Sequence, residues 1–341
     1  MKTAKIAEVL RGEQVESVHQ GIIAVVNENG KILASLGDTQ SLSFFRSAAR
    51  PFQALPVIES GVVVDYAFTL KDIAIIIGSH NGEPEHCEVV SEVLEKIGLS
   101  ADYLRCGIMP PRHKFSYEQL LIEGVDPSPL HNESSGIHAG MLVLARYLKQ
   151  PLDDYYLPEH PVQQEIIQCV AEAAGLRPED IPLGIDSCNV PTFALSIERM
   201  AYAYAKLAVP IHFSEVRNTA CEIVKAIYSS YPFLLAGTDR FTTDLLKATG
   251  SKFIAQDGAE GVYCLGIPDE GIGIAVKIAD GNERVIPPVV ISLLDQLGFL
   301  TAKEKDRLSA YSKGLIYNAC NKLVGEIRPA FSIKGAGARA E

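Results

Sequence analysis

The chain has no tryptophan and only seven cysteines among its 341 residues, and no two cysteines have Cys-x-x-Cys spacing. The cysteines are dispersed and odd in number, which is typical of free thiols in a reducing compartment rather than of a disulfide framework. The His-Glu-x-x-His motif and acidic calcium loops are also missing, although both are common signatures of metal sites. We therefore expect a cytoplasmic protein that needs no metal or other cofactor.

Positive charge is scarce as well, because 31 Lys and Arg side chains stand against 42 Asp and Glu side chains, for a net charge of −11. An acidic chain without a basic stripe is a poor partner for nucleic acid or for anionic membranes. No segment approaches the roughly 20 uninterrupted apolar residues that span a bilayer, and residues 1–16 lack the apolar stretch of a signal peptide. With 47% hydrophobic and 21% charged residues, the composition is typical of a folded protein with a sizeable core.

Two segments near the ends of the chain predict antiparallel hairpins. The first covers residues 22–36 and turns at Asn29-Gly30, a dipeptide whose two residues tolerate positive φ. The second covers residues 261–278 and turns at residues 268–271. Because the chain begins with antiparallel pairing, we do not expect it to begin with the parallel strands of a Rossmann fold.

Between the hairpins, apolar residues recur at intervals of three and four, which predicts helices with one buried face. We expect an α+β fold in which a central antiparallel sheet, completed by both ends of the chain, is flanked by helices and joined to a helical lobe built from the middle. Residues 1–341 then form a single domain, with a seam between two lobes at Pro151 to Pro158. The predicted helices cover residues 51–59, 84–97, 137–148, 161–174, 193–207, 214–228 and 242–247.

Ser47 and Arg50 have the Ser-x-x-basic spacing that places a hydroxyl and a cation on one face of a helix. That spacing is central to Ser-x-x-Lys acyl-transfer sites, where a neutral lysine takes the serine's proton. Arginine cannot take that role, because its pKa exceeds 12, but Arg50 could bind a carboxylate. The alternative is that Ser47 only caps a helix.

Ser79 begins a polar, glycine-containing turn directly after the apolar residues 73–77. Functional side chains are common in such turns. The alternative is a helix-to-helix turn in which Ser79 caps the second helix.

Two further polar turns precede predicted helices. In residues 132–140, backbone amides could bind an anion, or Ser134 could simply cap the helix, while His138 reads as a partly buried structural histidine. In residues 184–191, Asp186 could orient a substrate amine or close an Asx-type turn. Cys188 lies two positions further on, and a buried free cysteine usually behaves as a small hydrophobic residue.

Taken in order, these segments resemble the L-asparaginase II family, the bacterial asparaginases of the thermolabile Rhizobium type. The likeness covers roughly residues 5 to 330. The matching segments are residues 15–21, 46–56, 79–83, 134–141, 184–191, 236–241, 258–262 and 273–281.

The resemblance implies a fold like that of serine β-lactamases and bacterial glutaminases, a homodimer, and hydrolysis of asparagine to aspartate and ammonia. It also implies two catalytic serines, which correspond to Ser47 and Ser79. Arg50, Ser134, Asp186 and Cys188 fall in the substrate-binding part of the site.

This chain departs from the family at the site itself. Relatives pair each serine with a lysine. The first lysine position corresponds here to Arg50, and the second falls near Gln256, just before residues 258–261, with nearby Lys252 as the alternative. Relatives also hold zinc through two cysteines and a lysine, whose positions read here as Ser134, Ile137 and Cys188. One cysteine cannot bind zinc tightly, so we predict no zinc.

Three functions are therefore open. The first is an asparaginase-like amidohydrolase in which Lys252, Lys277, Tyr263 or a water molecule replaces the missing base. The second is a hydrolase of another small amide. The third is a weakened or inactive homologue that keeps the pocket and binds a small ligand.

Overall fold

The computed structural model describes residues 1–333, and the chain divides into two compact units. Unit 1 comprises Met1–Ala48, Leu195–Val209 and the chain from Lys247 onward, and unit 2 comprises Ala49–Ala194 and Pro210–Leu246. The seam predicted at Pro151 to Pro158 is wrong, because this segment lies inside unit 2. The reason is that Tyr155 is fully buried and its hydroxyl bonds the ring of His138, which ties the proline-flanked segment to the unit's core.

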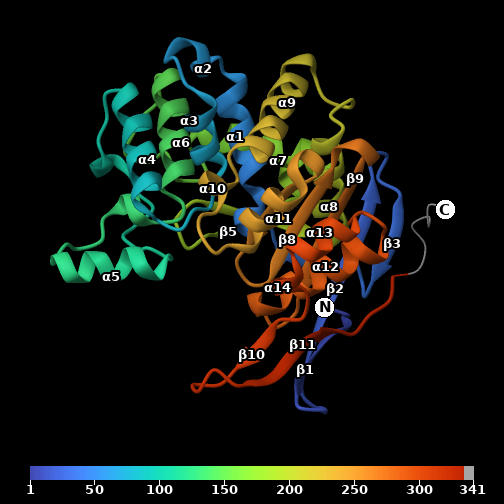
Figure 1. The fold of residues 1–341 in the computed structure, drawn as a ribbon. Helices are drawn as coiled ribbons and strands as arrows, with labels where there is room; N and C mark the ends of the chain where they lie inside the picture. Colours follow the sequence, from blue (N-terminus) through green and yellow to red (C-terminus); the bar gives the residue numbers. More distant parts are fainter. Residues whose placement is uncertain (334–341) are drawn as a thin grey trace. The chain divides into compact units, whose positions relative to one another are not determined.

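Unit 1 is built on an eight-stranded antiparallel sheet to which both ends of the chain contribute (Figure 1). Both predicted hairpins are confirmed, since β2 pairs with β3 and β8 pairs with β9 in antiparallel register. The strand order is β10 (Leu315–Tyr317), β11 (Leu323–Pro329), β1 (Ala4–Arg11), β2 (Gln14–Asn27), β9 (Ile272–Ile278), β8 (Val262–Ile267) and β7 (Ile254–Gly258), and β3 (Ile32–Leu36) pairs with β2.

Helix α8 (Ile197–Ala208) packs on β2, β8 and β9. Its approach is so close that a Cβ at Gly273 would lie 1.8 Å from the carbonyl oxygen of Ala201, so only glycine fits there. The helix predicted over residues 193–207 is wrong at its start, because β6 (Pro191–Ser196) occupies those residues and the Ser196 hydroxyl caps α8. Unit 1 also contains β4 (Leu42–Phe44), α12 (Ile286–Gln296), α13 (Ala302–Arg307) and α14 (Ser309–Ser312).

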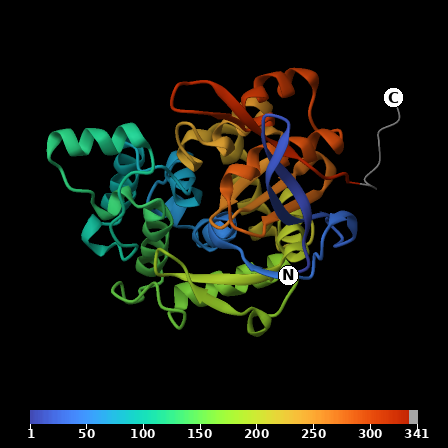
Figure 2. The same cartoon turned by 90° about the horizontal axis from the view of Figure 1, so that it is seen from below.

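Unit 2 is mainly helical, and α1, α3 and α6 pack on one another at its centre. Strand β5 (Leu183–Ile185) pairs in antiparallel register with β6, whose first four residues belong to this unit, and the two lie side by side in Figure 2. β6 is the middle strand of a small sheet with the order β4-β6-β5. The helices are α1 (Arg50–Glu59), α2 (Val62–Asp65), α3 (Leu70–Ile77), α4 (Pro84–Lys96), α5 (Lys114–Glu123), α6 (Ser135–Tyr147), α7 (Pro161–Ala174), α9 (Glu215–Ser230), α10 (Pro232–Leu235) and the first part of α11 (Phe241–Thr249).

The other six predicted helices are confirmed to within a few residues, as is the α+β class with an antiparallel sheet and a helical lobe. Within residues 1–333, none of the helices combines the length and the apolar character that crossing a bilayer requires.

Candidate active site

Ser47 lies in a 3-10 turn, η1 (Arg46–Ala49), that leads directly into α1. The helix N-cap is Ala49 and makes no side-chain capping bond, so the interpretation of Ser47 as a cap is wrong. Ser47 is 8% exposed, and within residues 1–333 its hydroxyl forms no hydrogen bond. A hydroxyl without a partner, on a residue that is itself largely buried, is available to a substrate or a base.

The end of β7 contacts the turn that carries Ser47. A Cβ on Gly258 would lie 3.0 Å from the Phe45 carbonyl oxygen and 3.2 Å from the Ala48 nitrogen. Gly258 pairs with Val262, which in turn pairs with Lys277 of β9. Because directly paired residues point to the same face of a sheet, Lys277 lies on the sheet face that meets the Ser47 turn.

The ammonium group of Lys277 is buried and donates hydrogen bonds to the carbonyl oxygens of Ile278, at 2.9 Å, and Glu260. Burial lowers the pKa of Lys277, and the charge of Arg46 lowers it further, while Glu260 and Asp280 raise it. Lys252 differs, because both oxygens of Glu304 accept from its ammonium group, at 2.7 and 2.8 Å. Of these two lysines, Lys277 is therefore the better candidate for a general base, because Lys252 is held in an ion pair with Glu304.

Ser79 lies in unit 2, in the turn between α3 and α4. Its amide donates to the carbonyl oxygen of Leu235 at 2.9 Å, and the residue is 2% exposed. The turn does join two helices, but the N-cap of α4 is Glu83 and not Ser79. Within the described part of the chain, the Ser79 hydroxyl has no hydrogen-bond partner.

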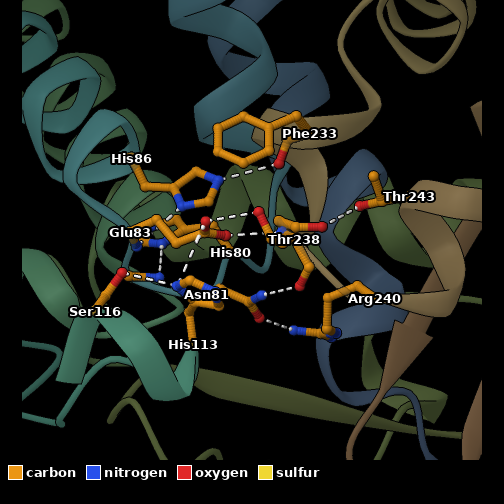
Figure 3. A network of polar contacts seen from close by, with 12 residues as sticks. His80, Asn81, Glu83, His86, His113, Ser116, Phe233, Thr238, Arg240 and Thr243 are labelled. Atoms are coloured by element: carbon orange, nitrogen blue, oxygen red, sulfur yellow. Dashed lines mark hydrogen bonds and ion pairs between the residues drawn. The ribbon is translucent and has the colours of Figure 1, made fainter. Parts of the chain in front are cut away.

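Two neutral histidines fix the backbone that follows Ser79. The Nδ1 atom of His80 accepts from the Gly82 amide at 3.1 Å, so its Nε2–H faces the Ser135 hydroxyl at 2.9 Å. His86 repeats this pattern, accepting from the Glu83 amide and donating to the Phe233 carbonyl oxygen (Figure 3). Burial lowers the pKa of both rings, which keeps them neutral.

The guanidinium of Arg50 is the centre of a buried cluster in unit 2. Nη2 donates to the Ser134 hydroxyl at 2.5 Å and lies 3.9 Å from Cys188 Sγ, while Nη1 donates to Gln53 at 3.2 Å. The side chain is 2% exposed, and its Nε–H has no partner within residues 1–333. The structure thus brings together three of the predicted site residues, Arg50, Ser134 and Cys188.

The charge of Arg50 extends to the neighbouring histidines. After burial, it is among the causes that lower the pKa of His80, which follows Ser79. Burial and then Arg50 lower the pKa of His138 to about 3. His138 is thus a structural histidine, as predicted, but it is fully rather than partly buried.

Asp186 lies in the turn between β5 and β6, two residues before Cys188. Its Oδ1 atom accepts from the Ser187 amide at 2.7 Å, and its carbonyl oxygen accepts from the Asn189 amide at 2.9 Å. The bond from the Asn189 amide closes the turn through the backbone, and both an Asx-type turn and a role in holding an amine stay predictions.

The three positions that correspond to zinc ligands do not fit a zinc ion. Ser134 accepts from a fixed guanidinium, Ile137 is a fully buried hydrocarbon, and Cys188 is a single sulfur beside a positive charge. Zinc needs several thiolate, imidazole or carboxylate donors. Across residues 1–333, no three His, Cys, Asp or Glu side chains are grouped as metal ligands.

The sequence did not reveal a polar network that ties the Ser79 turn to residues 237–240 (Figure 3). The Glu83 carboxylate accepts from both the amide and the hydroxyl of Thr238, each at 2.7 Å. Gly237 has φ 113°, and a Cβ there would lie 2.6 Å from Glu83 Oε1. Gly237, directly before Thr238, was the one feature of the sequence that pointed to a special backbone conformation here. Because Glu83 lies far away in the sequence, that glycine could not indicate which residue Thr238 contacts.

The fold and the site together define an α+β protein with two buried serines, whose hydroxyls have no hydrogen-bond partner within residues 1–333, and with a buried guanidinium in unit 2. The family model of L-asparaginase II matches residues 7–329. The chain therefore belongs to the L-asparaginase II family. Membership supports an amide hydrolase at the level of the family. Comparison with curated protein sequences gives no match.

Similar solved structures include a β-lactamase from Mycobacterium bovis, with 13% identity and a TM-score of 0.42 over 81% of this chain and 94% of that one. The structure of Mglu in its native form has 15% identity and a TM-score of 0.46, over 83% of this chain and 66% of that one. TM-scores below 0.5 are too low to carry a conclusion about this chain.

Proposed function

We propose that this protein is an asparaginase-type amidohydrolase that converts L-asparagine to L-aspartate and ammonia. Ser47 Oγ attacks the side-chain amide carbonyl, and the proton of the hydroxyl passes to the leaving nitrogen. The C–N bond then breaks, which releases ammonia and leaves an aspartyl ester on Ser47. Water then hydrolyses the ester, which releases aspartate and restores the Ser47 hydroxyl. Family membership over residues 7–329 is the observation that carries this proposal.

Ser47 as the nucleophile is supported by its hydroxyl, which has no hydrogen-bond partner within residues 1–333 and makes no capping bond. We assign the general base to Lys277, because burial lowers its pKa and the sheet register places it on the face that meets the Ser47 turn. Lys252 is the weaker candidate, since both oxygens of Glu304 accept from its ammonium group.

In unit 2, Ser79 relays the proton and Asp186 holds the substrate's α-amino group. Arg50 binds the α-carboxylate, and Ser134 and Cys188 line the same part of the site. This role for Arg50 is supported by a guanidinium that, within residues 1–333, is hydrogen-bonded to a hydroxyl, an amide oxygen and a sulfur but to no carboxylate. A buried cation of this kind gains most from an anionic ligand.

The experiment is ammonia release from asparagine by the purified full-length protein. Ser47→Ala should lower kcat at least about 1,000-fold, as the loss of a nucleophile does. Ser35→Ala, at an exposed position on β3, is the matched control and should leave the rate unchanged. Equal rates in the Ser47→Ala variant and the wild type would remove Ser47 from the mechanism.

The second candidate is a weakened or inactive homologue that binds a small ligand, and the observation in its favour is Arg50 itself. The arginine stands where relatives have a lysine, and it cannot deprotonate. Asparagine binding in a calorimeter without ammonia release would favour this candidate. Ammonia release from a different small amide, in a screen of amides, would instead favour a hydrolase of another substrate.

A further inference from the structure

Unit 2 contains a pocket of about 430 Å³ that the proposed reaction does not use. Its two walls come from residues 112–115 with Glu118 and from residues 238–240, and Asn81, which is 3% exposed, completes the lining. The volume is in the range of small-molecule sites. Part of its lining is visible in the network of Figure 3, where Asn81 lies between His113 and Arg240.

A single buried amide joins the two walls of this pocket. Asn81 Nδ2 donates to the Thr238 carbonyl oxygen at 2.8 Å, and its Oδ1 accepts from Arg240 Nη1 at 2.9 Å. On the other side, its backbone carbonyl oxygen accepts from the amide of Arg112 at 2.8 Å and from that of His113 at 3.2 Å. Hydrogen bonds therefore hold Asn81 in place on both sides, so the pocket contains one fixed, buried polar residue in addition to its surface side chains.

The lining carries more positive than negative charge in a protein whose net charge is −11. Arg112, Lys114 and Arg240 are cations, and Glu118 and Asp239 are anions. Lys114 and Glu118 pair with each other at 3.5 Å, so the two arginines account for the excess of positive charge. A guanidinium presents a planar fork of donors that matches a carboxylate. A Glu133 oxygen lies 3.3 Å from Arg112 Nη1, outside the pocket, which helps to orient that fork.

We propose that this pocket binds an acidic amino acid of the size of L-aspartate. Its two carboxylates would meet Arg112 and Arg240, and its ammonium group would meet Asp239. The exposed ring of Phe115 provides an apolar wall for the methylene group. Asparagine, with one carboxylate fewer, should bind more weakly. The binding claim does not depend on whether the chain hydrolyses asparagine.

The test is isothermal titration of the full-length protein with L-aspartate, L-asparagine, succinate and inorganic phosphate. Aspartate should bind more tightly than the other three. Arg112→Gln and Arg240→Gln should each weaken aspartate binding about 10- to 100-fold, as the loss of a charged hydrogen bond does. Arg177→Gln is the matched control, because Arg177 pairs with Glu179 and Asp180 at an exposed site in the same unit, and it should change nothing.

Two further variants keep the test decisive. Lys114→Gln, at a side chain that is 88% exposed, should fold normally and weaken binding about two- to fivefold. Arg50→Met removes the proposed carboxylate contact of the active site, and aspartate binding in the pocket should persist in it. No binding of aspartate, binding of phosphate with equal affinity, or unchanged affinity in Arg112→Gln and Arg240→Gln would overturn the proposal.

Discussion

The guanidinium of Arg50 donates a 2.5 Å hydrogen bond to the hydroxyl of Ser134. A buried cation usually has a carboxylate partner, but within the described residues Arg50 is hydrogen-bonded to none. Its charge instead acts on the neighbouring rings of His80 and His138. The same bond occupies the Ser134 hydroxyl, so this one contact bears both on the proposed recognition of substrate and on the poor fit of these residues to zinc.

Replacing Arg50 should affect substrate binding more than chemistry. We expect Arg50→Met to raise KM for asparagine about 10- to 100-fold, because a charged hydrogen bond to the α-carboxylate is lost, while kcat changes less. The KM of Arg50→Lys should lie between that of Arg50→Met and that of the wild type. Steady-state ammonia release measures both constants. An unchanged KM in Arg50→Met would show that the guanidinium does not bind the carboxylate.

The metal site should be recoverable by restoring its donors. The wild type should retain no stoichiometric zinc after dialysis, and a chelator should leave its thermal midpoint unchanged. A variant with Arg50→Lys, Ser134→Cys and Ile137→Lys should gain zinc, because it supplies two sulfurs and an amine and removes the guanidinium. Metal analysis of both proteins is the measurement. Stoichiometric zinc in the wild type would contradict the donor argument.

Lys277 and Lys252 should differ sharply as proton acceptors. Lys277→Met should lower kcat about 100- to 10,000-fold, the range for loss of a general base. Lys252→Met should lower kcat less than about tenfold. Lys277→Arg separates the base role from a structural one, since arginine can still donate to the carbonyl oxygens of Ile278 and Glu260. High activity in Lys277→Arg would rule out the base role.

The neutral, buried His138 should make stability depend on pH. Its pKa is about 3 in the folded protein against 6.5 for the free side chain, so between these values the unfolded chain binds a proton that the folded chain does not. Stability therefore rises with pH over this window and is lost as pH falls below about 6.5. From pH 7 to pH 5 the loss from this group is about 2 kcal/mol.

Urea unfolding at pH 7 and pH 5 measures this effect. In His138→Asn the difference in free energy of unfolding between the two pH values should shrink by about that amount. His212→Asn, at an exposed position, is the control and should keep the wild-type difference. The same pH dependence in wild type and His138→Asn would show that the ring is not the source.

Local patterns predicted much of the fold because they act over short distances. The Asn29-Gly30 turn selects its hairpin, and Pro161 begins α7 where the first turn of a helix accepts proline. The start of α8 was missed because Phe193 fits the spacing of a buried helical face equally well, and the strand is selected by its pairing in the β4-β6-β5 sheet.

The candidate site was predicted only in part, because its motifs are local in the sequence but its contacts are not. Ser47, Ser79 and Arg50 stand in recognisable motifs, but the contact of Arg50 with Ser134 spans 84 residues and is visible only in the structure. The pairing of Glu83 with Thr238 spans 155 residues and was missed entirely. That the hydroxyls of Ser47 and Ser79 share one pocket, and that the protein is a cytoplasmic homodimer, stay predictions.

Trapping the covalent intermediate tests the central claim most directly. The protein is mixed with asparagine, quenched in acid within the first turnover, digested, and analysed by mass spectrometry. The account predicts an aspartyl ester on the peptide that contains Ser47 and none on that peptide in Ser47→Ala. Ammonia release without any ester, or with the ester on the peptide that contains Ser79, would contradict it.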